Sequence, residues 1–214
     1  MTEVYTLLSL QSYLCDPCGT ASVPYWKQKV LIIPESMKIV HERDYINEMF
    51  RDYNDEPYFR LYHNLKDIKQ EITREVEIVS GVHNIGEFAQ LINASYSDLS
   101  VTTEQLESYR RMPVYCSDLW ILLKEKVSGI VLAGGIADYD REVNELILEW
   151  IQVLPSHRGH GYGQIIVNSL LSKMQGIANF ATVSGKVNNP TNPEILYRKC
   201  GFTGDDIWHI LTLK

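Results

Sequence analysis

The feature that most constrains this fold is a glycine-rich turn between an apolar run and an amphipathic segment. Residues 155–163 read PSHRGHGYG, in which three glycines alternate behind Arg158. The preceding residues 145–153 read ELILEWIQV, which is apolar enough for a buried strand, and residues 162–175 have the spacing of a helix. Glycine lets the backbone turn tightly and approach a ligand closely. The sequence therefore predicts a strand, a tight loop and a helix in immediate succession.

The chain from about Arg74 onward predicts a regular order of strands and helices around this turn. Short turns join several strands, which are therefore expected to be antiparallel, whereas the strand–helix–strand unit over 145–187 should hold two parallel strands. The expected fold is α+β, with a mixed, mostly antiparallel central sheet flanked by helices. The expected strands lie at 74–81, 118–125, 127–138, 142–153, 178–187 and 206–213, and the expected helices at 84–97, 102–111, 162–175 and 192–201.

Residues 1–73 carry no motif whose chemistry can be named. We expect them to form an N-terminal extension or small subdomain of unknown role, followed by the main domain at 74–214. The extension is either laid against the main sheet or part of a homodimer contact, and the sequence leaves both open. Its expected helices lie at 4–14 and 43–53, and its expected strands at 29–34, 37–42 and 57–65.

Composition and charge exclude several classes of partner. The 214 residues carry a formal charge of −7 and no long run of Lys or Arg, which argues against nucleic acid or an anionic membrane as the main partner. The same negative charge is compatible with a cationic substrate such as an amine. No apolar stretch approaches a bilayer span, and the start of the chain lacks a basic segment typical of a signal peptide. We therefore expect a cytoplasmic protein.

The cysteines and loop histidines do not indicate a metal site. Cys15 and Cys18 form a C-x-x-C, but a structural zinc site would need a second ligand pair at suitable spacing. The motif also lacks the strand–helix context of a redox site, so we expect unpaired thiols. His157 and His160 flank the glycine loop without a neighbouring carboxylate or third ligand, and no metal is expected.

A glycine-rich loop that opens a helix predicts an anion site. The first N–H groups of a helix have no partner within it and stand at the positive end of its dipole, and Arg158 adds a charge beside them. Two nucleotide-binding motifs do not fit. A Walker loop needs Lys and Ser or Thr after its last glycine, where this chain has Gln164 and Ile165. A dinucleotide fingerprint needs G-x-G-x-x-G rather than G-x-G-x-G.

Two motifs together give the chain a family resemblance. RGHGYG fits R/Q-x-x-G-x-G/A, and NPEILYRKCGF, residues 192–202, follows in the expected order and context. Over about 74–214 the chain resembles the GNAT superfamily of N-acetyltransferases, which implies acetyl-coenzyme A as co-substrate and an amine as acceptor. The resemblance implies diphosphate contacts from Arg158, Gly159, His160, Gly161, Tyr162 and Gly163.

The resemblance also implies roles for the flanking segments. A backbone N–H near Val153 and Leu154 is expected to bind the oxyanion. Asn189 and Asn192 are candidates for contacts to the pantetheine arm, although Asn192 before a proline also fits a helix N-cap. Tyr197 matches the tyrosine that protonates the leaving thiolate, with a packed core tyrosine as the alternative.

The general base is expected on the strand before the loop. A glutamate on an apolar central strand is costly to bury unless it is paired or functional, and Glu149 is the preferred base, with Glu145 or a water left open. Without a bulge, strand alternation puts on one face Glu145, Ile147, Glu149, Ile151 and Val153 and on the other Trp150 and Gln152.

Several alternatives remain open at this point. The chain could use a longer acyl-coenzyme A, or could bind coenzyme A without turnover as a sensing or assembly module. The acceptor is unidentified, and its selection is expected from residues 95–105 and from the first third of the chain. Aromatic residues within 23–27 and 57–65 either wall an acceptor cleft or pack against the sheet.

Overall fold

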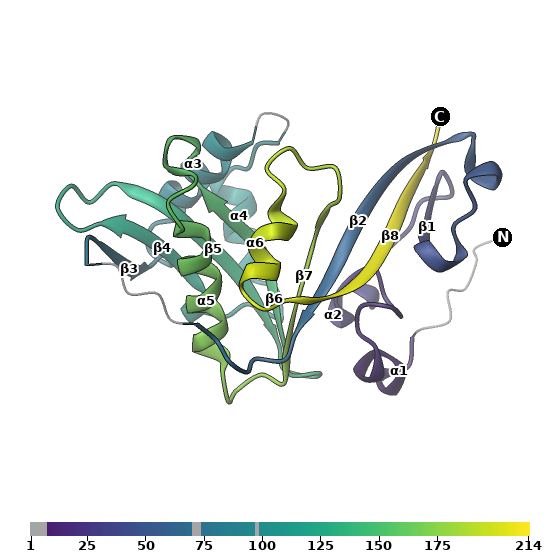
Figure 1. Cartoon of the computed structure of the whole chain (residues 1–214), viewed down its shortest axis with the longest axis horizontal. Coiled ribbons are helices and arrows are strands. Elements are labelled where there is room, and N and C mark those ends of the chain that lie inside the picture. Colours follow the sequence, from purple (N-terminus) through teal and green to yellow (C-terminus); the bar gives the residue numbers. More distant parts are fainter. Residues whose placement is uncertain (1–7, 70–73, 97–98) are drawn as a thin grey trace.

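A computed structural model of the protein describes residues 8–69, 74–96 and 99–214. In these residues eight strands form one sheet in the order β1-β8-β2-β7-β6-β5-β4-β3, with helices on both faces (Figure 1). The predicted α+β fold with a mixed, mostly antiparallel sheet is confirmed. The strands are β1 (Met37–His41), β2 (Tyr53–His63), β3 (Val76–Ser80), β4 (Trp120–Glu125), β5 (Val131–Asp140), β6 (Glu145–Val153), β7 (Phe180–Lys186) and β8 (Thr203–Leu213).

The helices form a layer on each side of the sheet. One face carries α5 and α6, whose apolar side chains join the largest core cluster with Leu146 and Leu148 of β6. The opposite face carries α3 and α4, which pack on Trp120 and Trp150. No helix in the described part of the chain is long and apolar enough to cross a membrane. The helices are α1 (Leu10–Cys15), α2 (Tyr25–Gln28), α3 (Ile85–Ser95), α4 (Thr103–Tyr109), α5 (Tyr162–Met174) and α6 (Pro193–Lys199).

Part of the first third belongs to the central sheet. β2 lies between β7 and β8 and pairs antiparallel with both, and β1 pairs with β8 at the edge. Figure 1 shows β2 and β8 side by side although they lie near opposite ends of the chain. The sheet therefore runs across the expected division at residues 73 and 74, while the division into folding units stays a prediction.

Two expected elements of the first third were wrong. Residues 29–34 form no strand, and Val30 and Ile32 are 66% and 87% exposed, so these apolar side chains are not buried against the sheet. Residues 43–53 form only 3₁₀ turns, η1 (Glu42–Asp44) and η2 (Asn47–Phe50). Between these turns the Tyr45 ring stacks on His209 of β8 at 3.7 Å, which holds the chain against the sheet.

The first expected helix is shorter in the structure. It begins at Leu10 because the Ser9 side chain accepts a hydrogen bond from the Ser12 N–H and caps it. Residues 4–7 of the expected helix lie outside the described residues. The strands and helices expected after residue 74 are all observed, with ends shifted by a few residues.

β6 and β7 separate to form a wedge. They pair in parallel only from Glu145 and Phe180 to Leu148 and Val183, as the predicted crossover requires. Beyond these residues both strands continue without pairing to each other. A β-bulge accompanies the separation: Trp150 pairs with Ile136 and Leu148 with Ala137, so Glu149 is the extra residue. Bulges bend and twist a strand away from its neighbour.

A buried polar network ties the closed end of the wedge to the N-terminal segment. Arg60 of β2 and Glu145 of β6 are 1% and 0% exposed and form an ion pair of 3.4 Å. The Tyr13 hydroxyl donates to Glu145 at 2.7 Å, and Thr182 of β7 also donates to this carboxylate. Arg60 donates in turn to the Pro17 carbonyl and the Tyr13 oxygen. One network therefore joins β2, β6, β7 and α1.

We expect the substitution Arg60→Met to lower the free energy of unfolding by about 3–5 kcal/mol, because it leaves Glu145 buried without its counter-charge. Lys186→Met removes the cation of an exposed pair with Glu56 and should cost less than about 1 kcal/mol. Urea unfolding at pH 7 measures both variants. Equal losses would show that the buried network contributes no more than a surface ion pair.

Candidate active site

The glycine-rich loop stands at the open end of the wedge, between β6 and α5. Gly159 and Gly161 have φ angles of +84° and +81°, in the left-handed region that favours glycine. Within the described residues, no amide N–H of residues 159–163 donates a hydrogen bond, and no side chain caps α5. These unpaired donors at a helix start are what the predicted anion site requires.

Gly163 brings three elements of the candidate site together. A Cβ at this position would stand 3.0 Å from Leu196 of α6 and 3.6 Å from Val153 of β6. The start of α5 therefore packs directly on the end of β6 and on the helix that carries Tyr197. The absence of a side chain at Gly163 permits this close approach.

The polar side chains of the loop make local contacts. Arg158 donates to the Ser95 carbonyl at 3.1 Å and so ties the loop to the end of α3. His160 hydrogen-bonds to loop carbonyls through Nδ1 and stacks on Tyr162, and His157 pairs with Ser156. Among the described residues, no group of three or more His, Cys, Asp or Glu side chains is arranged to hold a metal.

The end of β6 directs one backbone donor into the wedge. The Leu154 N–H donates to the Leu132 carbonyl at 2.9 Å and is therefore engaged with the neighbouring strand β5. Since successive N–H groups of a strand point to opposite sides, the Val153 N–H points away from β5, toward the side on which β7 has separated. Of the two expected oxyanion donors, Val153 has the suitable direction.

The two asparagines before α6 differ in their surroundings. The Asn189 side chain accepts hydrogen bonds from the backbone and hydroxyl of Thr191 and stabilises the turn. Asn192 occupies the N-cap position before Pro193, as expected, but its φ is +44° and its side chain forms no capping hydrogen bond. The expected N-cap position of Asn192 is therefore confirmed, without a side-chain capping hydrogen bond.

Tyr197 is buried in an aromatic setting. It is 7% exposed and packs near Phe59 and Phe202, with ring centroids 6.2 and 5.8 Å away. Burial, followed by the proximity of Tyr96, raises its pKa, so the phenol is protonated at neutral pH. A protonated phenol can act as a proton donor, while its packing on Phe59 and Phe202 also fits the alternative of a packed core tyrosine.

The bulge at Glu149 corrects the expected faces of β6. Before the bulge, Glu145 and Ile147 point to the face that carries α1 to α4, and Glu149 lies with Ile147 at the cavity described below. After it, Trp150 packs on the α3 and α4 side, whereas Ile151 and Val153 join the α5 core. Because Glu149 is an extra residue, each residue after it points to the face opposite to the one that strict strand alternation predicts.

The two candidate bases have different surroundings. Glu145 is fully buried and bonded to Arg60, Tyr13 and Thr182, which leaves it no contact with the wedge opening. Glu149 is partly exposed, with 23% of its side chain accessible. Its carboxylate pairs with the Lys27 Nζ of α2 at 2.6 Å. Glu149 is therefore the accessible carboxylate of this strand.

A second carboxylate and a tyrosine belong to this site, and the sequence analysis missed both. Asp138 of β5 lies directly opposite Ile147 and therefore on the same face as Glu149. Burial, and next the negative charge of Glu149, raises the pKa of Asp138 to about 8, while Lys27 opposes the shift. Tyr109 of α4 interacts with the same charges. An aspartate in the apolar run GGIAD was the available signal.

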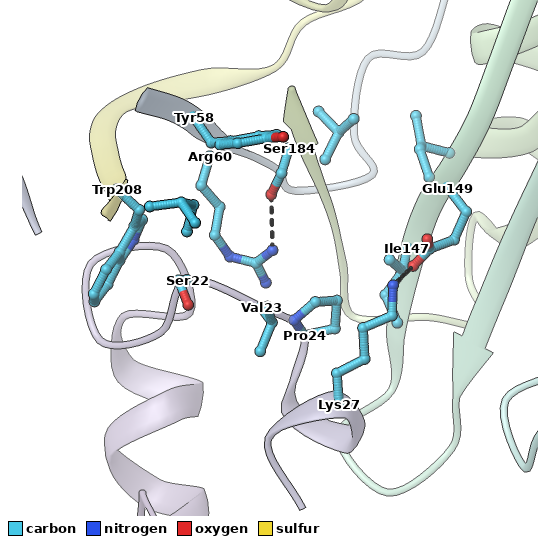
Figure 2. A pocket seen from close by; sticks show the side chains of 13 residues that line it. Ser22, Val23, Pro24, Lys27, Tyr58, Arg60, Ile147, Glu149, Ser184 and Trp208 are labelled. Carbon is cyan, nitrogen blue, oxygen red and sulfur yellow. Dashed lines mark hydrogen bonds and ion pairs between the residues drawn. The ribbon is translucent and has the colours of Figure 1, made fainter. Parts of the chain in front are cut away.

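A cavity of about 280 Å³ opens beside this carboxylate pair (Figure 2). Figure 2 shows Lys27 extending from α2 toward Glu149, with Arg60 and Ser184 on the opposite wall. The first third of the chain supplies much of the lining, including Tyr58, whereas Tyr62 packs on Phe180. The cavity is also lined by Ser22, Val23, Pro24, Ile147, Leu148, Val183, Trp208 and Ile210.

The sequence of this region matches a known domain family. Residues 116–204 match the family described as acetyltransferase (GNAT) domain, a range that includes the glycine loop and Tyr197. No curated protein matches the sequence.

Solved structures share the fold at low sequence identity. A GCN5-related N-acetyltransferase from Sphaerobacter thermophilus gives a TM-score of 0.65 at 15% identity, covering 87% of this chain and 63% of that one. A conserved protein of unknown function from Staphylococcus epidermidis gives 0.57 at 14%, covering 98% and 82%. The ribosomal-protein-S18-alanine N-acetyltransferase from Escherichia coli gives 0.51 at 15%, covering 64% and 92%. The chain thus spans less than two thirds of the Sphaerobacter protein.

We expect the Asp138 carboxyl to titrate with a pKa of about 8. Glu149→Gln removes a neighbouring negative charge and should lower this pKa, whereas Lys27→Met removes a positive charge and should raise it. Carbon-13 NMR of the aspartate carboxyls, with Asp138→Asn to identify the signal, measures the three values. A pKa that does not respond to either substitution would contradict the proximity of these groups.

Proposed function

Because residues 116–204 match the acetyltransferase (GNAT) domain family and the fold is shared with GNAT structures, we propose that this chain is an N-acetyltransferase that moves the acetyl group of acetyl-coenzyme A to a primary amine. One observation above all supports the proposal. A loop with unpaired amide donors stands at the open end of a wedge that has a carboxylate on one side and a buried tyrosine near it.

The loop has the features of a diphosphate cradle. A Cβ at Gly159 would meet no atom within 4 Å, so there is room against the backbone. The positive end of the α5 dipole and the Arg158 guanidinium favour an anion there. Acetyl-coenzyme A supplies this anion and the reactive thioester. In the proposal, residues 158–163 hold the diphosphate, and Asn189 and Asn192 lie along the pantetheine arm.

The proposed reaction assigns three roles to this chain's residues. Glu149 takes a proton from the incoming ammonium, directly or through water, because an alkyl ammonium with a pKa near 10.4 arrives protonated. The Val153 N–H binds the carbonyl oxygen as negative charge develops on it. Tyr197 donates a proton to the leaving sulfur, consistent with the raised pKa that keeps its phenol protonated.

The charge of the cavity supports a cationic acceptor. Asp138 and Glu149 face the same side, and Tyr58 and Trp208 add aromatic surface. The Glu149 carboxylate attracts an ammonium directly, and aromatic faces also favour cations.

We expect Gly161→Asp to weaken coenzyme A binding by at least about tenfold, because it adds a negative charge and a side chain to the cradle. Gly129→Asp is the matched control, since Gly129 has a φ of +73° and open space in the β4–β5 turn. Calorimetry of coenzyme A binding measures both variants. Equal affinity for Gly161→Asp and wild type would mean that the ligand lies elsewhere.

We expect Tyr197→Phe to lower kcat by about 100-fold with coenzyme A affinity retained, because the sulfur loses its proton donor. Thiol release from acetyl-coenzyme A with a panel of primary amines measures turnover. Unchanged kcat would remove Tyr197 from the mechanism. Tight binding by the wild type without thiol release for any amine would favour a binding module instead of an enzyme.

A further inference from the structure

An amine of the protein itself occupies the acceptor side of the wedge. The Lys27 Nζ lies 2.6 Å from the Glu149 carboxylate, which belongs to the first residue of β6 beyond its pairing with β7. Lys27 lines the same cavity as Leu148 and Val183, the last paired residues of the two strands. The cavity therefore connects this primary amine with the point at which the wedge opens (Figure 2).

The position of Lys27 is fixed by the segment that carries it. The Tyr25 ring at the start of α2 lies 5.3 Å from the ring of Tyr13, which is fully buried. Lys29, two residues further on, pairs with Glu142 at the surface, and Glu142 is 50% exposed. The two lysines at the end of α2 thus differ: Lys29, the C-cap residue, pairs with an exposed carboxylate, and Lys27 pairs with the proposed general base inside the cavity.

We propose that Lys27 is itself an acyl acceptor, so that the protein acylates its own Lys27 when it holds an acyl thioester of coenzyme A. The inference rests on the proposed function, since it uses the same base and the same wedge. Within this chain, Glu149 is placed to take one proton from the Lys27 ammonium, and the neutral Nζ is placed to attack.

The step balances as an ordinary aminolysis. The bond from Nζ to the acyl carbon forms and the bond from that carbon to sulfur breaks. Glu149 passes the first proton from Nζ to water. The nitrogen loses its second proton as the amide forms, and Tyr197 gives one proton to the leaving sulfur, so that one proton is released overall. The products are an amide on Lys27, the free thiol of coenzyme A and one proton. The amide has no charge, so Glu149 loses its counter-cation and the cavity becomes more negative.

The test incubates the purified full chain with acetyl-coenzyme A and no added amine, followed by intact mass and peptide mapping. The expected result is one acetyl group on Lys27, at a rate independent of protein concentration. Glu149→Gln and Gly161→Asp should each slow this by at least about tenfold, whereas Lys29→Arg should match wild type. Lys27→Arg should remain unmodified.

Three results would overturn the inference. If Lys27 stays unmodified in a protein that acetylates free amines, the inference is wrong and the proposed function still stands. Equal modification of Lys27 and Lys29, unaffected by Glu149→Gln, would mean spontaneous chemistry in solution. Failure to bind coenzyme A and to acetylate any amine would overturn both proposals together.

A readout without coenzyme A tests the ion pair directly. Nitrogen-15 NMR of the lysine ammonium groups should show a slowly exchanging Lys27 signal that disappears in Glu149→Gln and persists in Glu142→Gln. A Lys27 signal that exchanges as fast in the wild type as in Glu149→Gln would remove the contact on which the inference depends.

Discussion

The ion pair between Arg60 and Glu145 holds together the part of the sheet from which the wedge and the glycine-rich loop extend. Both side chains are almost fully buried, and they join β2, β6, β7 and α1 at the end where β6 and β7 still pair. Burial raises the pKa of Glu145 and so disfavours its charge, and the guanidinium opposes this effect. Because two buried charges are costly without each other, the four elements are held in one arrangement. The strands can separate further along without the sheet coming apart.

A single extra residue then determines what each side of the sheet presents. Glu149 stands at the bulge in β6, so the strand turns away from β7 and its alternation reverses. The acidic side chains remain on the side of α1 to α4, while Ile151 and Val153 turn to the α5 core. The glycine-rich loop and the acidic side chains therefore lie at one strand end but on different sides of it, and the wedge connects them.

The sequence predicted the elements after residue 74 because each has a local signal, such as alternation, the apolar spacing of a helix or a glycine turn. It did not predict that β2 enters the sheet between β7 and β8, since pairing between distant strands leaves no local pattern. The loop and Tyr197 were found through motifs. Asp138 and Lys27 were missed because their proximity to Glu149 arises only when β5, β6 and α2 come together. Because of the bulge, strand alternation alone also predicted the wrong faces for the residues of β6 after Glu149.

The insertion of β2 has a consequence for how the chain reaches its native state. Glu56 on β2 and Lys186 next to it on β7 are 130 positions apart, and β2 also pairs with β8, which follows β7 in the chain. Both edges of β2 therefore stay unpaired in a nascent chain until β7 and β8 have been synthesised. Contacts of such long range slow folding, and unpaired strand edges invite association between chains. This strand carries two charged residues and a proline, DEP at 55–57, which disfavour such association.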